Sequence, residues 1–244
     1  MPGALDAVLF DWGDTLFEFV WDDGLVEAGW EAGLAALGRE EVPSRDEAVA
    51  HFREHYLPYL WVPGALDEIE YPGMIRDSLA EFGVEVSDDE LARFLEAEHA
   101  AWEPARVMGA GTHALLDSLR DRGLRVGLVS NVFDPGWLCR NDLERMGLAE
   151  RLDVAVFSSD VRKRKPHPAI FRAALDELGV APERTLFVGD RRFEDVRGAK
   201  EVGMLTAQAL WFRADADERG VDPDFEAFTP TDVLNVVRRI LGET

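Results

Sequence analysis

The sequence predicts an α/β fold: a Rossmann-like parallel sheet flanked by helices, with an all-helical segment inserted after the first strand. From residue 106 onward, short apolar runs alternate with helical patterns, which is typical of parallel strands joined by right-handed crossovers. Between residues 19 and 105 the apolar residues recur at helical spacing. We therefore expect a core of residues 1–18 and 106–244, and a helical domain of residues 19–105.

The individual elements follow from local signals. The apolar run 7–10 reads as a buried strand that stops abruptly at Asp11. Ser44 followed by Glu47 has the pattern of a capping box, and Ser87 precedes an acidic first turn. The inserted segment is expected to hold helices over 22–38, 44–60, 66–82 (interrupted at Pro72-Gly73) and 87–104. In the core, helices are expected over 113–122, 136–147, 168–179, 193–203 and 229–241, strands over 124–130, 152–158, 185–188 and 204–210, and a surface loop over 215–224.

The composition excludes several classes of function. The 244 residues carry 48 acidic and 26 basic side chains, for a formal charge of −22. Nucleic acids and anionic membranes need clustered Lys and Arg, so neither is an expected partner. Cys139 is the only cysteine, which excludes an intrachain disulfide and favours a cytoplasmic location. The sequence shows no signal-like N-terminal segment and no apolar run of membrane-spanning length.

Four polar residues stand where predicted strands end or shortly after. The carboxyl ends of parallel strands lie along one edge of a sheet, where ligands bind in open α/β folds. These side chains can therefore converge despite their wide separation in sequence, and they would place two carboxylates, a hydroxyl and an ammonium group in one pocket. The four residues are Asp11, Ser130, Lys165 and Asp190.

This set resembles the four motifs of the haloacid dehalogenase (HAD) superfamily, whose members are mostly phosphatases with an Asp nucleophile and Mg²⁺. All four occur in the family's order and spacing, and the resemblance covers residues 4–16 and 106–241. The inserted segment 19–105 looks like the family's mobile cap, which confers substrate choice. The motifs read Asp11-Trp-Gly-Asp-Thr-Leu, Ser130-Asn131, Lys165-Pro-His-Pro-Ala-Ile-Phe and Gly189-Asp-Arg-Arg-Phe-Glu-Asp195.

The resemblance implies roles for individual residues in a Mg²⁺-dependent phosphatase that acts on a small phosphorylated metabolite. Asp11 would attack phosphorus and form an aspartyl-phosphate, which splits one difficult step into two. The Mg²⁺ ligands would be the Asp11 and Asp190 carboxylates and the Gly13 carbonyl, and Asp195 would orient a metal-bound water or Lys165. Lys165 would also keep Asp11 ionised. The residues expected to bind the phosphate are Thr15, Ser130, Asn131 and Lys165.

The first motif departs from the family pattern at Gly13. Most family phosphatases have a second Asp there, which protonates the leaving group; such general acids contribute about 10² to 10⁴ in rate. The neighbouring Asp14 is not expected to compensate, because successive side chains in an extended loop point in different directions. Three explanations stay open: a substrate with a good leaving group, a proton donated by the cap, or binding without much turnover.

Two other functions are therefore alternatives. A dehalogenase-like carbon–halogen hydrolase needs no leaving-group acid or metal, but such enzymes usually lack the counterpart of Asp190. The second alternative is a phospho-ligand binding protein with little or no catalysis. Phosphonate hydrolases resemble this chain at Trp12-Gly13 but use a cap lysine, and residues 19–105 contain none.

The inserted segment is rich in aromatic residues, most of which we expect in its core. Those between Tyr56 and Trp61 are candidates for the substrate entrance, with Arg39, Arg45 or Arg53 as partners for an anion. The protein is expected to be a monomer or a homodimer.

Overall fold

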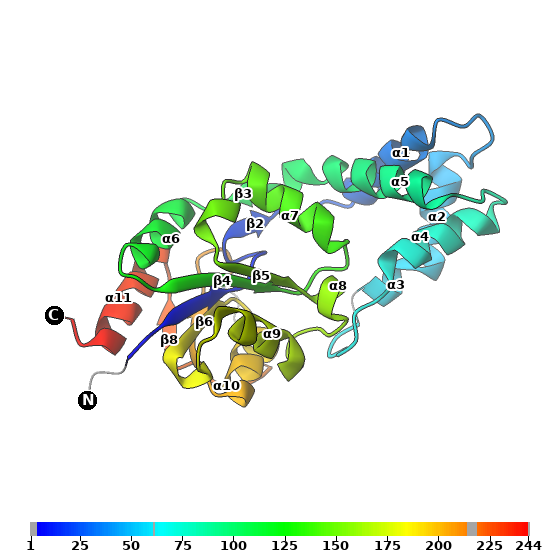
Figure 1. The fold of residues 1–244 in the computed structure, drawn as a ribbon. Helices are drawn as coiled ribbons and strands as arrows, with labels where there is room; N and C mark the ends of the chain where they lie inside the picture. Colours follow the sequence, from blue (N-terminus) through cyan, green and yellow to red (C-terminus); the bar gives the residue numbers. More distant parts are fainter. Residues whose placement is uncertain (1–3, 61, 214–218, 244) are drawn as a thin grey trace.

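A computed structural model describes residues 4–60, 62–213 and 219–243. Its centre is a six-stranded sheet in the order β5-β4-β1-β6-β7-β8, and every neighbouring pair runs parallel (Figure 1). β1 is flanked by β4 and β6, so the chain builds one side of the sheet first and then the other. The strands are β1 (Ala7–Phe10), β4 (Arg125–Ser130), β5 (Val154–Phe157), β6 (Thr185–Gly189), β7 (Leu205–Ala209) and β8 (Phe225–Ala227).

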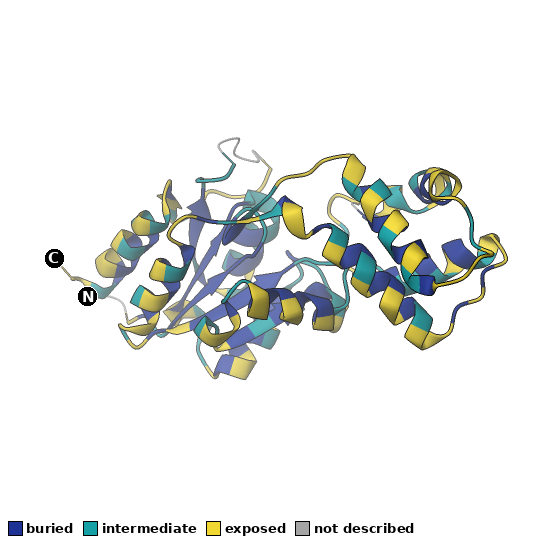
Figure 2. Ribbon diagram, turned by 90° about the horizontal axis from the view of Figure 1, so that it is seen from above, coloured by how far each residue is buried: buried dark blue, intermediate teal, exposed yellow. Residues whose placement is uncertain are grey.

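Helices cover both faces of the sheet. Because side chains alternate along a strand, Val8 and Phe10 pack with α6, α7 and α11, whereas Ala7 and Leu9 pack with α9 and α10. Figure 2 shows the result: the sheet is buried and the helices are exposed on their outer sides. These helices are α6 (Thr112–Arg120), α7 (Gly136–Arg145), α9 (Pro168–Leu178), α10 (Gly198–Val202) and α11 (Pro230–Leu241).

A helical insertion, defined here as residues 24–101, lies at one end of the molecule, away from the two termini (Figure 1). Trp30 and Phe94 contact each other in its core, with ring centroids 5.2 Å apart. Phe133 and Leu138 join this same apolar cluster from the sheet side of the molecule. The helices are α1 (Gly24–Leu37), α2 (Arg45–His55), α3 (Leu57–Leu60), α4 (Tyr71–Glu81) and α5 (Asp88–Ala101).

The predicted fold class is confirmed, and the elements match the sequence patterns closely. The capping boxes at Ser44 and Ser87 are both formed. The third inserted helix was predicted wrongly: residues 66–70 are not helical, and α4 begins at Tyr71 with Pro72 in its first turn. Proline is tolerated there because the first helical N–H groups have no partner within the helix. Among the described residues the insertion contains five helices instead of four.

Four other elements were not predicted, since all are too short for a periodic pattern. A two-stranded antiparallel ribbon of β2 (Phe17–Phe19) and β3 (Arg106–Met108) connects the insertion to the sheet. α8 (Ser158–Val161) follows β5 directly, and β8 follows the acidic stretch. Of the predicted loop 215–224, residues 219–224 are irregular as expected, and the rest lies outside the described residues. Short turns are η1 (Glu103–Ala105), η2 (Ala149–Arg151), η3 (Pro182–Arg184) and the π-helical η4 (Arg192–Arg197).

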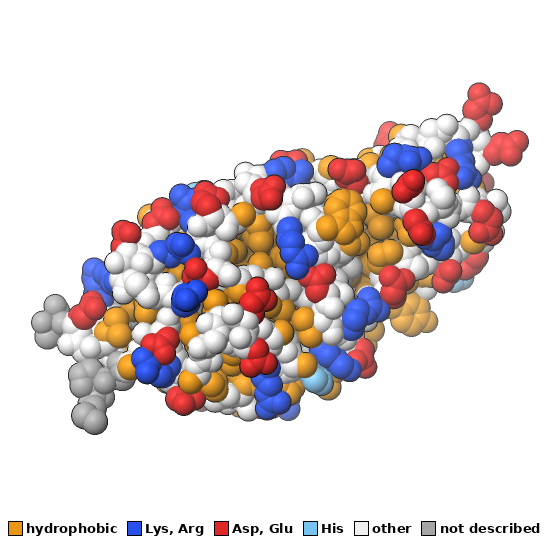
Figure 3. Space-filling view, in the orientation of Figure 1, with side chains coloured by type: hydrophobic (Ala, Val, Ile, Leu, Met, Phe, Trp, Pro, Cys, Tyr) orange, Lys and Arg blue, Asp and Glu red, His pale blue; other side chains and the backbone are white. Residues whose placement is uncertain are grey.

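The surface agrees with the acidic composition. On the face drawn in Figure 3, acidic and basic side chains are interspersed. In the part of the chain that the structure covers, no helix is long and apolar enough to cross a membrane.

Candidate active site

The predicted residues gather at the carboxyl edge of the sheet. The register pairs Phe10 with Leu128 on one side and with Val188 on the other, so Asp11 emerges level with the last residues of β4 and β6. The Asp11 N–H still bonds the Val188 carbonyl at 2.9 Å, which fixes the start of the loop. Ser130 ends β4 and is buried, and Asp190 directly follows β6 and is buried too. The convergence predicted from strand order is thus observed.

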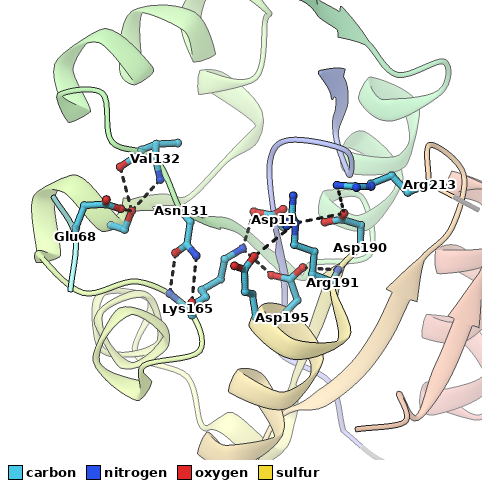
Figure 4. Close-up of polar contacts among 11 residues, drawn as sticks. Asp11, Glu68, Asn131, Val132, Lys165, Asp190, Arg191, Asp195 and Arg213 are labelled. Atoms are coloured by element: carbon cyan, nitrogen blue, oxygen red, sulfur yellow. Dashed lines mark hydrogen bonds and ion pairs between the residues drawn. The ribbon is translucent and has the colours of Figure 1, made fainter. Parts of the chain in front are cut away.

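Lys165 brings the ammonium group into this site from the segment between α8 and α9. Its Nζ lies 2.6 Å from Asp11 Oδ1 and 2.7 Å from Asp195 Oδ1 (Figure 4). Burial alone would lower the pKa of Lys165, but these two carboxylates raise it above its ordinary value. The site therefore holds a permanent cation against Asp11.

Asp195 is held by a turn that only glycine allows. A Cβ at position 189 would collide with the Asp195 carboxyl group, so Gly189 is needed where β6 meets η4. The Asp195 Oδ2 accepts a 2.9 Å hydrogen bond from the Arg191 N–H. Burial raises the pKa of Asp195, while Lys165 opposes that rise. Both Asp195 oxygens are thus engaged within the protein.

Asp190 is the third carboxylate of the site, and one of its oxygens has no hydrogen-bond donor in the described structure. One oxygen from each of Asp11, Asp190 and Asp195 lies within 4.8 Å of the others. The Asp190 Oδ1 is buried and has no hydrogen-bond partner among the described residues. Burial and then the two neighbouring carboxylates raise the pKa of Asp190 well above its ordinary range. The unpartnered buried oxygen of Asp190, which lies close to two other carboxylates, is suited to a hard divalent cation, because such a cation prefers oxygen ligands.

Two arginines flank Asp190, and the sequence did not single them out. Arg191 Nε lies 3.8 Å from Asp190 Oδ2, and Arg213 Nη1 lies 3.9 Å from the same oxygen (Figure 4). Arg191 lies within the fourth motif, so its place beside Asp190 could have been predicted from the sequence. Arg213 follows β7 by four residues, and nothing in the sequence pattern connected it with the site.

The loop after β1 carries Gly13, Asp14 and Thr15. Asp14 has a left-handed backbone (φ 57°), its Oδ1 accepts a 3.1 Å hydrogen bond from the Phe19 N–H, and its Oδ2 lies 3.3 Å from Arg213 Nη1. The Thr15 hydroxyl is buried and has no partner within the described ranges. Both carboxylate oxygens of Asp14 are therefore engaged, and the Thr15 hydroxyl is unengaged.

Asn131 is tied to Lys165 through the backbone. Its Oδ1 accepts a 2.7 Å hydrogen bond from the Lys165 N–H, and its Nδ2 donates a 3.2 Å hydrogen bond to the Lys165 carbonyl. The side-chain amide thus holds the loop that carries the lysine, and both of its polar atoms are used in doing so.

The arginines suggested as anion partners in the insertion each pair with a carboxylate. Arg39 pairs with Glu90 at 2.6 Å, and Arg53 pairs with Glu27 at 2.8 Å. Arg45 lies 2.8 Å from its neighbour Asp46. Carboxylates within the insertion therefore neutralise all three. Of the aromatic residues proposed for the entrance, Tyr59 is exposed, and Trp61 lies outside the described residues.

Comparison with known proteins identifies the family. A family model described as haloacid dehalogenase-like hydrolase matches residues 5–203. The chain therefore belongs to the haloacid dehalogenase-like hydrolases, which confirms the family and the hydrolase class expected from the four motifs.

Individual relatives agree with this assignment. A glyceraldehyde 3-phosphate phosphatase of Methanopyrus kandleri is 36% identical over 129 residues, which is 51% of this chain and 54% of that protein. A HAD phosphatase structure from Thermococcus onnurineus has a TM-score of 0.64 and 25% identity, covering 96% of this chain and 98% of that one. A 2-haloacid dehalogenase structure from Pseudomonas syringae has a TM-score of 0.66 and 20% identity, covering 96% and 99%, and shares the fold.

Proposed function

We propose that this protein is a Mg²⁺-dependent phosphatase that hydrolyses a small phosphorylated metabolite through an aspartyl-phosphate on Asp11. The observation that carries the proposal is the buried, unpartnered oxygen of Asp190 beside the Asp11–Lys165 ion pair. A carbon–halogen hydrolase has no use for a metal-binding carboxylate at this position. The phosphatase relatives support the same choice of reaction.

Asp11, Asp190 and the Gly13 carbonyl would hold the Mg²⁺. When bound, the ion supplies positive charge that stabilises the transferring phosphoryl group and relieves the repulsion between the carboxylates. Asp195 is less suited to be a ligand, because Lys165 and the Arg191 N–H occupy its two oxygens. We assign it the expected role of holding Lys165.

The reaction would begin with attack of an Asp11 oxygen on phosphorus. The bond between phosphorus and the leaving oxygen breaks, and its electron pair goes to that oxygen. Water then attacks the phosphorus of the aspartyl-phosphate, which releases phosphate and restores Asp11. Lys165 neutralises charge on the phosphate throughout this sequence, because the two carboxylates beside it keep it protonated.

Phosphate binding is assigned to Lys165, the buried Ser130 and the Thr15 hydroxyl, which has no other partner in the described structure. Asn131 has a further role in this scheme: its side chain positions the Lys165 loop, and the second hydrogen of its Nδ2 group remains a donor for a phosphate oxygen.

The loop after β1 provides no proton donor for the leaving group. Gly13 offers no acid, and the two carboxylate oxygens of Asp14 are engaged by Arg213 and the Phe19 N–H. We therefore propose that the preferred substrates have good leaving groups, such as acyl phosphates, anhydrides or aryl esters, whose departure requires little protonation.

We further propose that residues 19–105 form a cap domain on a core of residues 1–18 and 106–244. Support comes from the separate apolar cluster of the insertion. A cytoplasmic location and a monomeric or homodimeric state stay predictions.

A substrate screen tests the proposed function. It should combine acyl, aryl and alkyl phosphates with 2-chloropropionate, each with Mg²⁺ and with a chelator. We expect Mg²⁺-dependent release of phosphate, fastest for the acyl and aryl compounds. Release of chloride independent of Mg²⁺ would establish the dehalogenase instead. Binding of orthovanadate without turnover of any compound would establish a binding protein.

A further inference from the structure

The segment between α3 and α4 reaches from the helical insertion to the sheet side of the molecule (Figure 1). We call its residues 66–69 the strap. The strap pairs in antiparallel fashion with residues 162–164: the Arg164 N–H bonds the Leu66 carbonyl at 2.9 Å, and the Glu68 N–H bonds the Arg162 carbonyl at 3.3 Å. The strap therefore contacts the segment that leads directly into Lys165.

Glu68 is the one fully buried member of the strap. Its side chain is 0% exposed, although its neighbours Leu66 and Asp67 are exposed. Burying a carboxylate is costly unless hydrogen bonds and a counter-charge compensate it. Arg164 Nη1 lies 2.8 Å from Oε1, and the Ser158 hydroxyl donates to Oε2. The sheet side thus supplies a counter-charge and a hydroxyl donor, and Oε1 also accepts a 3.0 Å hydrogen bond from the Ile69 N–H of the strap.

The two sheet-side partners of Glu68, Arg164 and Ser158, are both connected to active-site residues. Arg164 precedes Lys165, and Ser158 Oγ accepts a 2.8 Å hydrogen bond from the N–H of Val132, which follows Asn131. Asn131 in turn bonds the Lys165 backbone at both of its polar atoms. These contacts form a closed ring that joins the strap to the two loops that carry Asn131 and Lys165.

We propose that Glu68 is a positioning residue: its carboxylate, docked between Ser158 and Arg164, fixes the loops that hold Lys165 against Asp11. This inference rests on the proposed function for its catalytic consequence. The insertion contributes to the active site through the strap, even though Glu68 itself touches none of the reacting groups. When Glu68 is docked, the Lys165 ammonium is aligned for phosphate; when it is released, the two loops lose a shared anchor.

The test compares Glu68→Gln and Glu68→Ala with the control Asp67→Asn. Asp67 lies on the same strap and pairs with Lys163, but this pair is exposed, and exposed pairs contribute little. Glu68→Gln keeps the size of the side chain, so it provides a variant to measure if Glu68→Ala fails to fold. Two measurements are made on each variant: amide hydrogen exchange, and hydrolysis of para-nitrophenyl phosphate with Mg²⁺.

We expect exchange of the Val132 and Lys165 amides to accelerate about tenfold or more in the Glu68 variants, because the contacts that protect them are weakened. We expect kcat to fall by about 10 to 100-fold with KM changed less than about threefold, since small displacements of a catalytic group are costly. Asp67→Asn should leave both measurements near the wild-type values.

Faster exchange confined to the strap, or an unchanged kcat in folded Glu68 variants, would overturn the proposal. An equal loss in Asp67→Asn would overturn it as well, because the effect would then belong to the strap as a whole. If the wild-type protein hydrolyses no phosphate, the proposed function fails, and the exchange of Val132 and Lys165 alone decides whether Glu68 positions the two loops.

Discussion

Lys165 Nζ lies 2.6 Å from Asp11 Oδ1, although 154 positions separate the two residues in the chain. The pair is buried, and Asp195 Oδ1 lies 2.7 Å from the same nitrogen. A buried charge is tolerated only when its partners are well placed, so this contact couples the ends of three segments of the fold. The proposed nucleophile and its cation are thus fixed by the protein itself, before substrate binds.

Asp11→Asn tests the nucleophile. An amide oxygen does not form the aspartyl-phosphate, so we expect phosphatase turnover to fall by about 10³-fold or more, a loss typical of a missing nucleophile. The variant should retain its circular dichroism spectrum, because Asn has the same shape as Asp. Asp6→Asn, which removes the half-buried carboxylate partner of Arg184 far from the site, is the control and should keep full activity. Retained turnover in Asp11→Asn would remove this residue from the nucleophilic role.

Gly13→Asp tests the missing general acid. A Cβ at position 13 would meet only Phe17 Cζ, at 3.7 Å, which is an ordinary van der Waals contact. We expect turnover of alkyl phosphates to rise by about tenfold or more and that of aryl phosphates to change little, because only alkyl leaving groups need the proton. Gly13→Asn, which matches the size of Asp without its acidity, should give no such gain. An equal gain in both variants would assign the effect to shape.

The parts of the site that the sequence could predict were those fixed by strand ends. Asp11, Ser130 and Asp190 follow or end apolar runs, and parallel strands bring such ends to one edge. The four motifs then connected these residues with a family, and the family match agrees. Periodicity and capping patterns also located most helices of the insertion, because each needs only neighbouring residues.

The parts that could not be predicted depend on contacts between distant segments. Arg213 reaches Asp190 from the loop after β7, and Glu68 reaches Arg164 from the insertion. Neither Arg213 nor Glu68 stands in a local sequence pattern that distinguishes it from a solvent-exposed side chain, and charged residues are usually exposed. The same reason applies to Arg39, whose partner Glu90 lies 51 positions away.

Asp190→Asn tests the metal site by a measurement that does not need turnover. A ligand that binds only the folded state stabilises it by mass action, by about 2.7 kcal/mol at a concentration of 100 Kd. We expect millimolar Mg²⁺ to raise the melting temperature of the wild-type protein and a chelator to reverse the change. The rise should disappear in Asp190→Asn and persist in Asp222→Asn, whose side chain is exposed. A wild-type melting temperature that does not change when Mg²⁺ is added would contradict the proposed metal site.

A second buried cluster lies where α5 meets α7 and the loop after β4. His99 Nε2 lies 2.8 Å from Asp142 Oδ2, and His99 Nδ1 lies 3.1 Å from Asp134 Oδ2. The Tyr71 hydroxyl donates a 2.6 Å hydrogen bond to the neighbouring Glu98. Burial would lower the pKa of His99, but the two aspartates raise it to about 8. Burial raises the pKa of Glu98 to about 8.

These pKa values predict that stability falls as the pH rises from about 6.5 to about 8. Folding favours the protonated form of both groups, so the folded state binds more protons than the unfolded state in this window. Each extra proton bound by the folded state lowers the free energy of unfolding by about 1.4 kcal/mol for every unit that the pH rises. Urea unfolding at pH 6.5 and 8.5 measures the difference. Glu98→Gln removes one of the two groups and keeps an acceptor for Tyr71, so its stability should depend less steeply on pH. Glu96→Gln, an exposed change on the same helix, should retain the wild-type slope; equal slopes in all three proteins would exclude Glu98 as the source.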